Sequence, residues 1–284
     1  GETGQHLWAH RTDGVLGIEA AAEEPLATRI AAALQPCLRL AEVDRARRKP
    51  DVNLGPHDLA LRALPGVLSL DRDGNARALE LLERAIERDP GHALANALAA
   101  WARVQRVVYH FTAIPLEERA RSTALARKAM AGAGDATVLA VLGNALTLLN
   151  DLDAADVVIR KALAVDGGSA WAWSRSGWLG VYRGNPAAAI ERFKIALELA
   201  PNDPLAFNSM VGIGCAHFHD GNYLESARWQ ERALVEHPSA IWVHRTMGPA
   251  YALGGAKAEA QKSLATLRQH HPALHRRQRK DRQR

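Results

Sequence analysis

Proline or glycine turns recur along most of this chain at a nearly constant distance. The turn markers are Pro90, Gly134, Gly167, Pro201, Pro238 and Pro272. They are 44, 33, 34, 37 and 34 residues apart, and between them apolar residues return at three- and four-residue spacing. That spacing predicts two amphipathic helices in each unit. One such pair cannot bury its apolar faces alone, so the period predicts several pairs stacked into a continuous core.

Small residues and turn dipeptides subdivide the units. Glycine stands where paired helices would cross closely, at Gly143, Gly177 and Gly248. Gly-Asn dipeptides at 184–185 and 221–222 mark turns between the helices of a pair. Two units are longer than a 34-residue repeat: residues 93–135 carry about ten extra residues around 109–115, and residues 204–240 carry about three extra before Gly214.

This arrangement resembles the tetratricopeptide repeat (TPR), whose pattern W-x2-L-G-x2-Y…A-x3-F…P has a 34-residue period. The best-fitting unit, residues 170–203, supplies Trp173, Ser176, Gly177, Ala189, Phe193, Ala196 and Pro201. We therefore predict an all-α chain: a TPR helical-hairpin solenoid of about six units over residues 51–274, preceded by a small α/β remnant.

Residues 1–50 do not follow the repeat. A short strand is predicted at 5–11, then an amphipathic helix from Glu23 to Leu34, an interruption at Pro36, and a charged helix from Leu38 to Arg48. The run at 2–14 resembles the last strand of a TolB-like α/β domain, and the segments 60–66 and 81–90 resemble the repeats that follow such a domain. Residues 1–50 are thus interpreted as the end of that domain plus a linker helix.

The TolB-like and TPR tandem implies the C-terminal part of a bacterial multidomain signalling protein. The head domain of such a protein is either a class III adenylate/guanylate cyclase, which we prefer, or a winged-helix DNA-binding domain of a transcriptional regulator. Neither head domain is present in the sequence, so neither activity transfers to a residue of this chain. A free-standing TPR scaffold is the third alternative.

The charge of the chain is concentrated at its end. The formal net charge is +5, and residues 275–284 hold six basic side chains and one acid, which is +5 by themselves. This basic tail is predicted to be disordered, and it either keeps the chain soluble or touches nucleic acid or anionic lipid through charge alone. Two distant cysteines and the lack of an apolar run near 18 residues predict a cytoplasmic chain without a membrane span.

The sequence offers little chemistry. No phosphate-loop string occurs, and Gly212-x-Gly214 lacks the third glycine of a dinucleotide site. Cys215 and His219 could share a helix face as metal ligands, but no further ligand has matching spacing, and ordinary packing is the preferred interpretation. The acids at 71, 73, 151 and 153 are interpreted as turn and capping residues. We predict no catalytic residue, no cofactor and no metal, and therefore no enzyme.

The TPR resemblance implies a partner groove on the concave surface, lined by the first helix of each unit. Carried over position by position, the groove residues are Asn144, Thr147, Trp171, Ser174, Trp178, Asn208, Phe218, Trp242 and Arg245. Such a groove suits a protein or an extended apolar peptide, or the chain's own upstream domain, and offers no direct nucleic-acid site. The alternative is that Trp171, Trp178 and Trp242 fill contacts between repeats.

Overall fold

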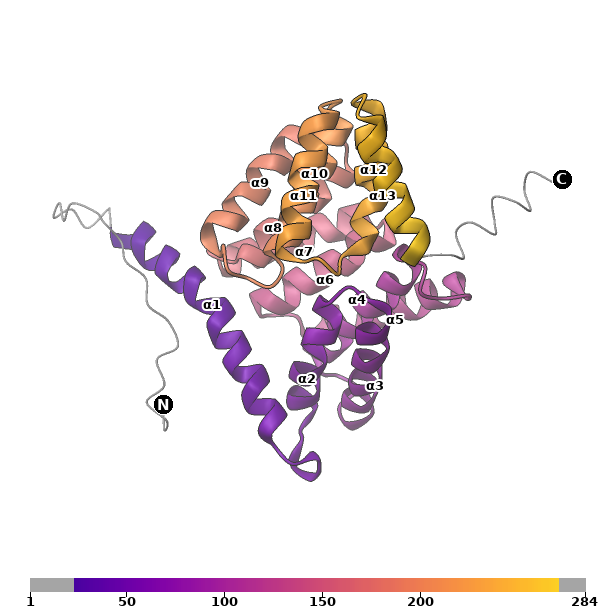
Figure 1. Cartoon of the computed structure of the whole chain (residues 1–284). Coiled ribbons are helices and arrows are strands. Elements are labelled where there is room, and N and C mark those ends of the chain that lie inside the picture. The colour runs from indigo at the N-terminus through magenta and orange to yellow at the C-terminus, as the bar shows by residue number, and fades with distance from the viewer. Residues whose placement is uncertain (1–22, 271–284) are drawn as a thin grey trace. The chain divides into compact units, whose positions relative to one another are not determined.

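The structure, a computed structural model, describes residues 23–270, with side chains from residue 30 onward (Figure 1). Within this range the chain forms thirteen α-helices and two short 3-10 helices and no strand, so the prediction of an all-α fold is confirmed there. The predicted strand at 5–11 and the basic tail at 275–284 lie outside the described residues.

Twelve of the helices follow one another as six consecutive pairs, which agrees with the predicted number of repeat units. A long helix α1 (Glu23–Arg48) and the 3-10 helix η2 (Asp51–Asn53) precede them, and η3 (Ile241–Val243) leads into the last pair. The pairs are α2 (Pro56–Leu68) with α3 (Arg72–Arg88), α4 (Ala93–Val108) with α5 (Pro115–Gly132), α6 (Ala136–Leu149) with α7 (Leu152–Val165), α8 (Ala170–Tyr182) with α9 (Pro186–Leu199), α10 (Ala206–His219) with α11 (Tyr223–Glu236), and α12 (His244–Leu253) with α13 (Lys257–His270).

The chain divides into two compact units. Unit 1 comprises Gly1–Arg175 and Ile195–Ala206, and unit 2 comprises Ser176–Lys194 and Phe207–Arg284. Helices α8 and α9 therefore contribute residues to both units. Each unit is described below by itself.

Side-chain caps and left-handed turns set the helix ends. Asp71 accepts a hydrogen bond from the backbone N–H of Gly74 at 2.8 Å, and Asp151 caps α7 in the same way. The acids at 73 and 153 lie in the first turns of α3 and α7, so the capping and turn interpretation of these acids is confirmed. Gly184 and Gly221 have φ of +71° and +79°, which only glycine adopts without strain, at the two predicted turns.

Glycine also permits the close crossing of paired helices. A β-carbon on Gly143 would lie 2.5 Å from Ile159 Cγ1, and one on Gly177 would lie 2.7 Å from the ring of Phe193. At Gly248 the corresponding contact, with Ser263 Oγ, would be 3.3 Å. The predicted crossing role of these glycines is confirmed, and each crossing depends on the absence of a side chain.

The two long units differ from the others where the sequence indicated. Helices α4 and α5 have 16 and 18 residues, whereas α6 and α7 have 14 each, and residues 109–114 connect α4 to α5. The insertion of the 204–240 unit falls in the connection from α9 to α10, residues 200–205. Both extensions leave the helical pairing intact because they lengthen helices or connections and not the crossing region.

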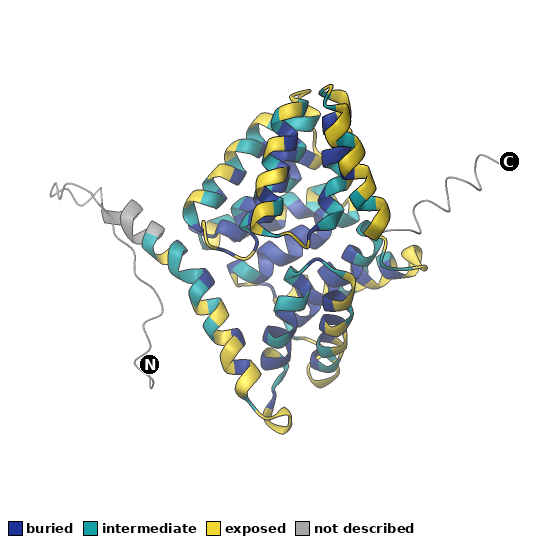
Figure 2. Cartoon of the chain, in the orientation of Figure 1, coloured by how far each residue is buried: buried dark blue, intermediate teal, exposed yellow. Residues whose placement is uncertain are grey.

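First and second helices of unit 1 differ in burial. Figure 2 shows α6 buried along most of its length, with residues 138–147 all buried. Helix α5 buries only one stripe, at Glu118, Ser122, Ala126 and Ala129. This pattern is expected when first helices pack between neighbouring pairs, and it limits how much of α6 a partner could touch.

The predicted interruption at Pro36 is wrong. Helix α1 continues through this proline, which is buried. A proline inside a helix removes one hydrogen bond and costs about 3 kcal/mol. The residues Ala32 and Val43 on either side of it are buried, and sequence periodicity alone could not show this packing.

Candidate partner-binding surface

All nine predicted groove residues lie on the first helices of their pairs or in η3, but their burial differs between the two units. In unit 1, Asn144, Thr147, Trp171 and Ser174 are all buried, with exposed fractions of 5% or less. The Thr147 hydroxyl donates to the backbone oxygen of Gly143 at 2.8 Å inside α6. These side chains have little free surface for a ligand.

Trp171 lies in a polar cage that the sequence did not reveal. Its indole Nε1 is 3.1 and 3.0 Å from the two carboxylate oxygens of Asp203, in the connection from α9 to α10. The guanidinium of Arg39, from α1, stacks on the indole with its carbon 3.8 Å from the ring centroid and forms a 3.0 Å ion pair with Asp203. Burial lowers the pKa of Arg39, and the charge of Asp203 opposes that shift.

Asn144 and Ser174 are joined by a buried cation, Arg175. Its guanidinium donates to Asn144 Oδ1 at 2.8 Å and to Ser174 Oγ at 3.3 Å, and it lies 5.7 Å from the ring centroid of Trp101. Burial lowers the pKa of Arg175 to about 10, so the side chain still carries its charge at neutral pH. Neutral oxygens and an aromatic face thus replace water around this cation.

Most of the predicted groove residues of unit 2 are more exposed than those of unit 1. Trp178 is half-buried; its Nε1 donates to the buried Asn208 Oδ1 at 2.9 Å, and its ring meets Phe193 edge-on with centroids 5.6 Å apart. This contact joins α8 to α10, and a hydrogen bond between Thr246 and Cys215 joins α10 to α12. The first helices of unit 2 therefore touch one another in order.

The three remaining predicted residues lie at the C-terminal end of α10, in η3 and in α12. Phe218 is half-buried against the cluster of Ala227, Met247, Ala250 and Tyr251. Trp242, in η3, is half-buried, and Arg245, in the first turn of α12, is exposed. Together with Trp178 they are the predicted groove residues of unit 2 that are half-buried or exposed.

The Cys215–His219 pair lacks the character of a metal site. Burial raises the pKa of the Cys215 thiol to about 12, so the neutral thiol is the state present at neutral pH. Among residues 23–270, no three His, Cys, Asp or Glu side chains gather as a metal site would require.

Arg39, Asp203 and Arg175 are the residues that sequence reasoning missed. No departure from the repeat marked Asp203, which is the last residue of the best-fitting unit and lies in the connection from α9 to α10. No periodic signal marks Arg39, since α1 is outside the repeats. Arg175 sits in a regular repeat helix, where an arginine is ordinarily exposed.

The comparisons with known proteins agree with this geometry. No family model matches the chain. Cut9, in a crystal structure of the APC/C hetero-tetramer Cut9–Hcn1, matches 87% of this chain and 46% of its own at 14% identity, with a TM-score of 0.57. Human IFIT1 matches 75% of this chain and 50% of its own at 15% identity, also with a TM-score of 0.57. The chain has a TPR fold.

Other matches to this TPR chain are shorter or looser. A tetratricopeptide repeat protein from Parabacteroides merdae aligns over 75% of this chain and 78% of its own at 19% identity, with a TM-score of 0.45. In sequence, "Putative adenylate cyclase 3" of Rhizobium meliloti (strain 1021) is 33% identical over 97 residues, which is 34% of this chain and 16% of that protein. The TPR helices between 23 and 270 include none long and apolar enough to cross a bilayer.

Proposed function

We propose that this TPR chain is a protein-interaction module whose partner-binding face is formed by the first helices of unit 2. The fold supports an interaction module, and the residues of this face supply its chemistry. The observation that carries the proposal is that Trp178, Phe218 and Trp242 are half-buried and that Arg245 is exposed. All four lie on first helices of unit 2 or in η3. Aromatic side chains and arginine are the residue types that most often dominate protein interfaces.

The placement in unit 2 follows from the contrast with unit 1. There Asn144, Trp171 and Ser174 are buried and their polar groups bond within the fold. A ligand at those residues would have to replace contacts already made. In unit 2 Trp178 and Trp242 are only half-buried, so part of each side chain remains exposed to a ligand.

The side chains of unit 2 favour a protein segment over nucleic acid as the ligand. Cut9 assembles with a protein, Hcn1, whereas the human IFIT1 structure contains m7Gppp-AAAA, so the fold alone does not choose between them. Binding of a phosphate backbone needs several lysines or arginines together. Helix α10 carries neither residue type, and Arg245 is the single Lys or Arg within α12. An extended segment with apolar side chains fits this face better.

Replacement of Trp242 by Ala is expected to weaken binding of such a segment at least tenfold, because an aromatic anchor at an interface contributes about 2 kcal/mol or more. A random library of extended peptides, selected on the full chain, supplies the ligand. Fluorescence anisotropy then measures its affinity for the variant and for the wild type.

Trp229→Ala provides the matched control. Trp229 is also half-buried in unit 2 but belongs to the second helix α11, where its ring lies 4.3 Å from the Arg232 guanidinium carbon. The control should bind as the wild type does. Equal losses for both variants would show a general effect on stability and would contradict the proposed face, as would unchanged affinity for Trp242→Ala.

We further propose that the chain comes from an adenylate cyclase-type signalling protein. The support is the sequence match to "Putative adenylate cyclase 3" together with the resemblance of residues 2–14 to the end of a TolB-like domain. The match spans about a sixth of that relative, so cyclase activity belongs to the proposal and not to the residues of this chain.

The genomic sequence immediately upstream of residue 1 tests this context. We expect it to encode a cyclase domain, recognisable by paired metal-binding acids on strands that hold two divalent cations. An upstream helix-turn-helix with a β-wing, or a start codon at residue 1, would contradict the cyclase context while leaving the interaction module untouched.

A further inference from the structure

Helix α1 contacts unit 1 at several places. Its contacts run from the first helical pair, at α2, to the connections that precede α8 and α10. Near its C-terminal end the backbone oxygen of Ala46 accepts a hydrogen bond from Arg62 of α2 at 2.9 Å. Farther toward its N-terminus, Gln35 donates to Asp166 at 2.7 Å, and Arg39 pairs with Asp203 at 3.0 Å. Asp166 lies just before α8, and Asp203 lies just before α10, so one helix touches elements more than a hundred residues away.

One face of α1 is complementary to unit 1. The residues Ala32, Pro36, Val43 and Ala46 are buried, and with Arg39 they follow one another at spacings of four, three, four and three. This is the spacing of a helix packed along one seam. The flanking Leu38 is 54% exposed, so α1 packs through small residues and its polar groups and leaves larger apolar ones outside.

The two ends of α1 are held by contacts of different kinds. The C-terminal end has the fully buried Ala46, the bond from Arg62 and a 2.7 Å ion pair between Lys49 and Asp58 at the start of α2. In the segment around residue 35, the buried apolar residues are the small Ala32 and Pro36, Ile30 and Leu34 are half-buried, and the polar latch adds to these contacts. We use the term latch for Gln35, Arg39, Asp166, Trp171 and Asp203.

Arg39 makes two of the contacts of the latch, one with Asp203 and one with Trp171. The guanidinium of Arg39 is 14% exposed and the carboxylate of Asp203 is 5% exposed, and the same guanidinium covers the indole of Trp171. If Arg39 leaves, the buried carboxylate loses its counter-charge and the indole loses its cover. The latch is therefore cooperative: the ion pair and the cation–π contact break together.

We propose that the N-terminal half of α1 is a displaceable internal ligand of unit 1, released when the latch opens. The exposed face would be Trp171 with the carboxylates Asp166 and Asp203 beside it. The partner that fits this face is a helix with the same chemistry: a glutamine or similar donor and an arginine four residues apart, beside alanine-sized residues. This interaction is separate from the aromatic face of unit 2 and does not depend on it.

Hydrogen exchange of the full chain carrying Arg39→Ala tests the release. Detached from unit 1, the N-terminal half of α1 should not stay helical, because Pro36 disfavours an isolated helix and isolated helices of this length are marginal in water. We expect the amides of residues 33–42 to exchange at least tenfold faster than in the wild type, with α2 to α7 unchanged. Arg47→Ala is the control, since Arg47 lies on the same helix but pairs only with Asp44 at an exposed site, 3.7 Å away.

Rescue in trans tests the binding face. A labelled peptide of residues 30–42 should bind the Arg39→Ala chain at least tenfold more tightly than it binds the wild-type chain, whose own α1 competes. The same peptide with Arg39→Ala should bind neither chain. Gln35→Ala is a milder change in the latch. It should also speed amide exchange in residues 33–42 and tighten peptide binding, so the test does not depend on the folding of the Arg39 variant alone.

Two results would overturn the proposal. If Arg39→Ala leaves residues 33–42 within twofold of the wild-type exchange rate and the peptide does not bind, α1 is a fixed part of unit 1. If exchange rises equally throughout α2 to α7, α1 belongs to the core of unit 1 and is not a ligand.

Discussion

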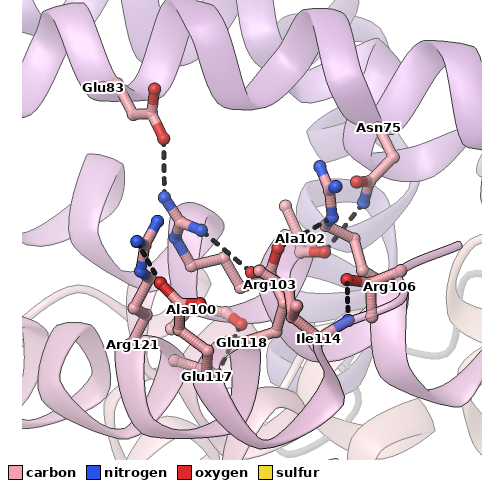
Figure 3. Close-up of polar contacts among 12 residues, drawn as sticks. Asn75, Glu83, Ala100, Ala102, Arg103, Arg106, Ile114, Glu117, Glu118 and Arg121 are labelled. Carbon is pink, nitrogen blue, oxygen red and sulfur yellow. Dashed lines mark hydrogen bonds and ion pairs between the residues drawn. The ribbon is translucent and has the colours of Figure 1, made fainter.

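Replacing Glu118 by Ala is expected to lower the free energy of unfolding by about 3–5 kcal/mol, the usual cost of removing one partner from a buried ion pair. The Glu118 carboxylate is 5% exposed and lies 2.9 Å from Arg103 and 3.0 Å from Arg106 (Figure 3). These arginines come from α4 and the glutamate from α5, so the cluster fixes one helical pair of unit 1. Its loss removes the carboxylate that the two guanidinium groups share, although Arg103 keeps its 2.6 Å ion pair with the half-exposed Glu83.

The adjacent residue supplies the control for this experiment. Glu117 is 49% exposed and pairs only with Arg121 one turn along the same helix. Glu117→Ala should change the free energy of unfolding by no more than about 0.5 kcal/mol. Urea unfolding followed by circular dichroism compares the two midpoints. Similar midpoints for both variants would show that the cluster contributes no more than a surface pair.

Phe193→Ala is expected to destabilise the chain by about 3–5 kcal/mol, because it removes a large core ring that the surroundings cannot replace. Phe193 is fully buried and lies between two glycines of unit 2. A β-carbon on Gly177 would lie 2.7 Å from the ring, and one on Gly212 would lie 2.2 Å from Cζ. The ring thus occupies the space that two missing side chains leave.

A double-mutant cycle checks this fit. Gly212→Ala should destabilise the chain by about 1–3 kcal/mol through overpacking. Combined with Phe193→Leu, which shortens the side chain, it should cost less than the sum of the two single changes. Thermal unfolding of the four proteins gives the coupling. Strict additivity would mean that the backbone shifts at this crossing and that the ring does not set the spacing.

The repeats could be predicted from the sequence because their signals are local. A glycine at each crossing and a turn residue at each end act within one hairpin, and Gly143, Gly177 and Gly248 take the roles that their spacing indicated. Capping acids such as Asp71 bond to their own helix. Such features depend on neighbours a few residues away, which a single sequence displays directly.

Features that depend on distant segments could not be predicted. The resemblance placed Trp171 in a partner groove, yet its surroundings come from Arg39, which lies before the repeats, and from Asp203 in the connection from α9 to α10. The burial of Arg175 depends on Asn144 and Trp101 in other repeats. Repeat spacing assigns a residue to a helix face, but only the packed structure shows whether that face is already filled. The groove assignment itself stays a prediction, tested by the Trp242 variant.

The glycine crossings have a consequence for how such a chain can diverge. At Gly143, Gly177, Gly214 and Gly248 an added β-carbon would meet the partner helix of the same hairpin at 2.5 to 3.3 Å. These positions are 34, 37 and 34 residues apart. A larger residue should therefore be poorly tolerated at these positions, above all at Gly143, Gly177 and Gly214, and this constraint recurs along the gene with the period of the repeats. Lineages of this chain can exchange their surfaces rapidly while these few positions stay small.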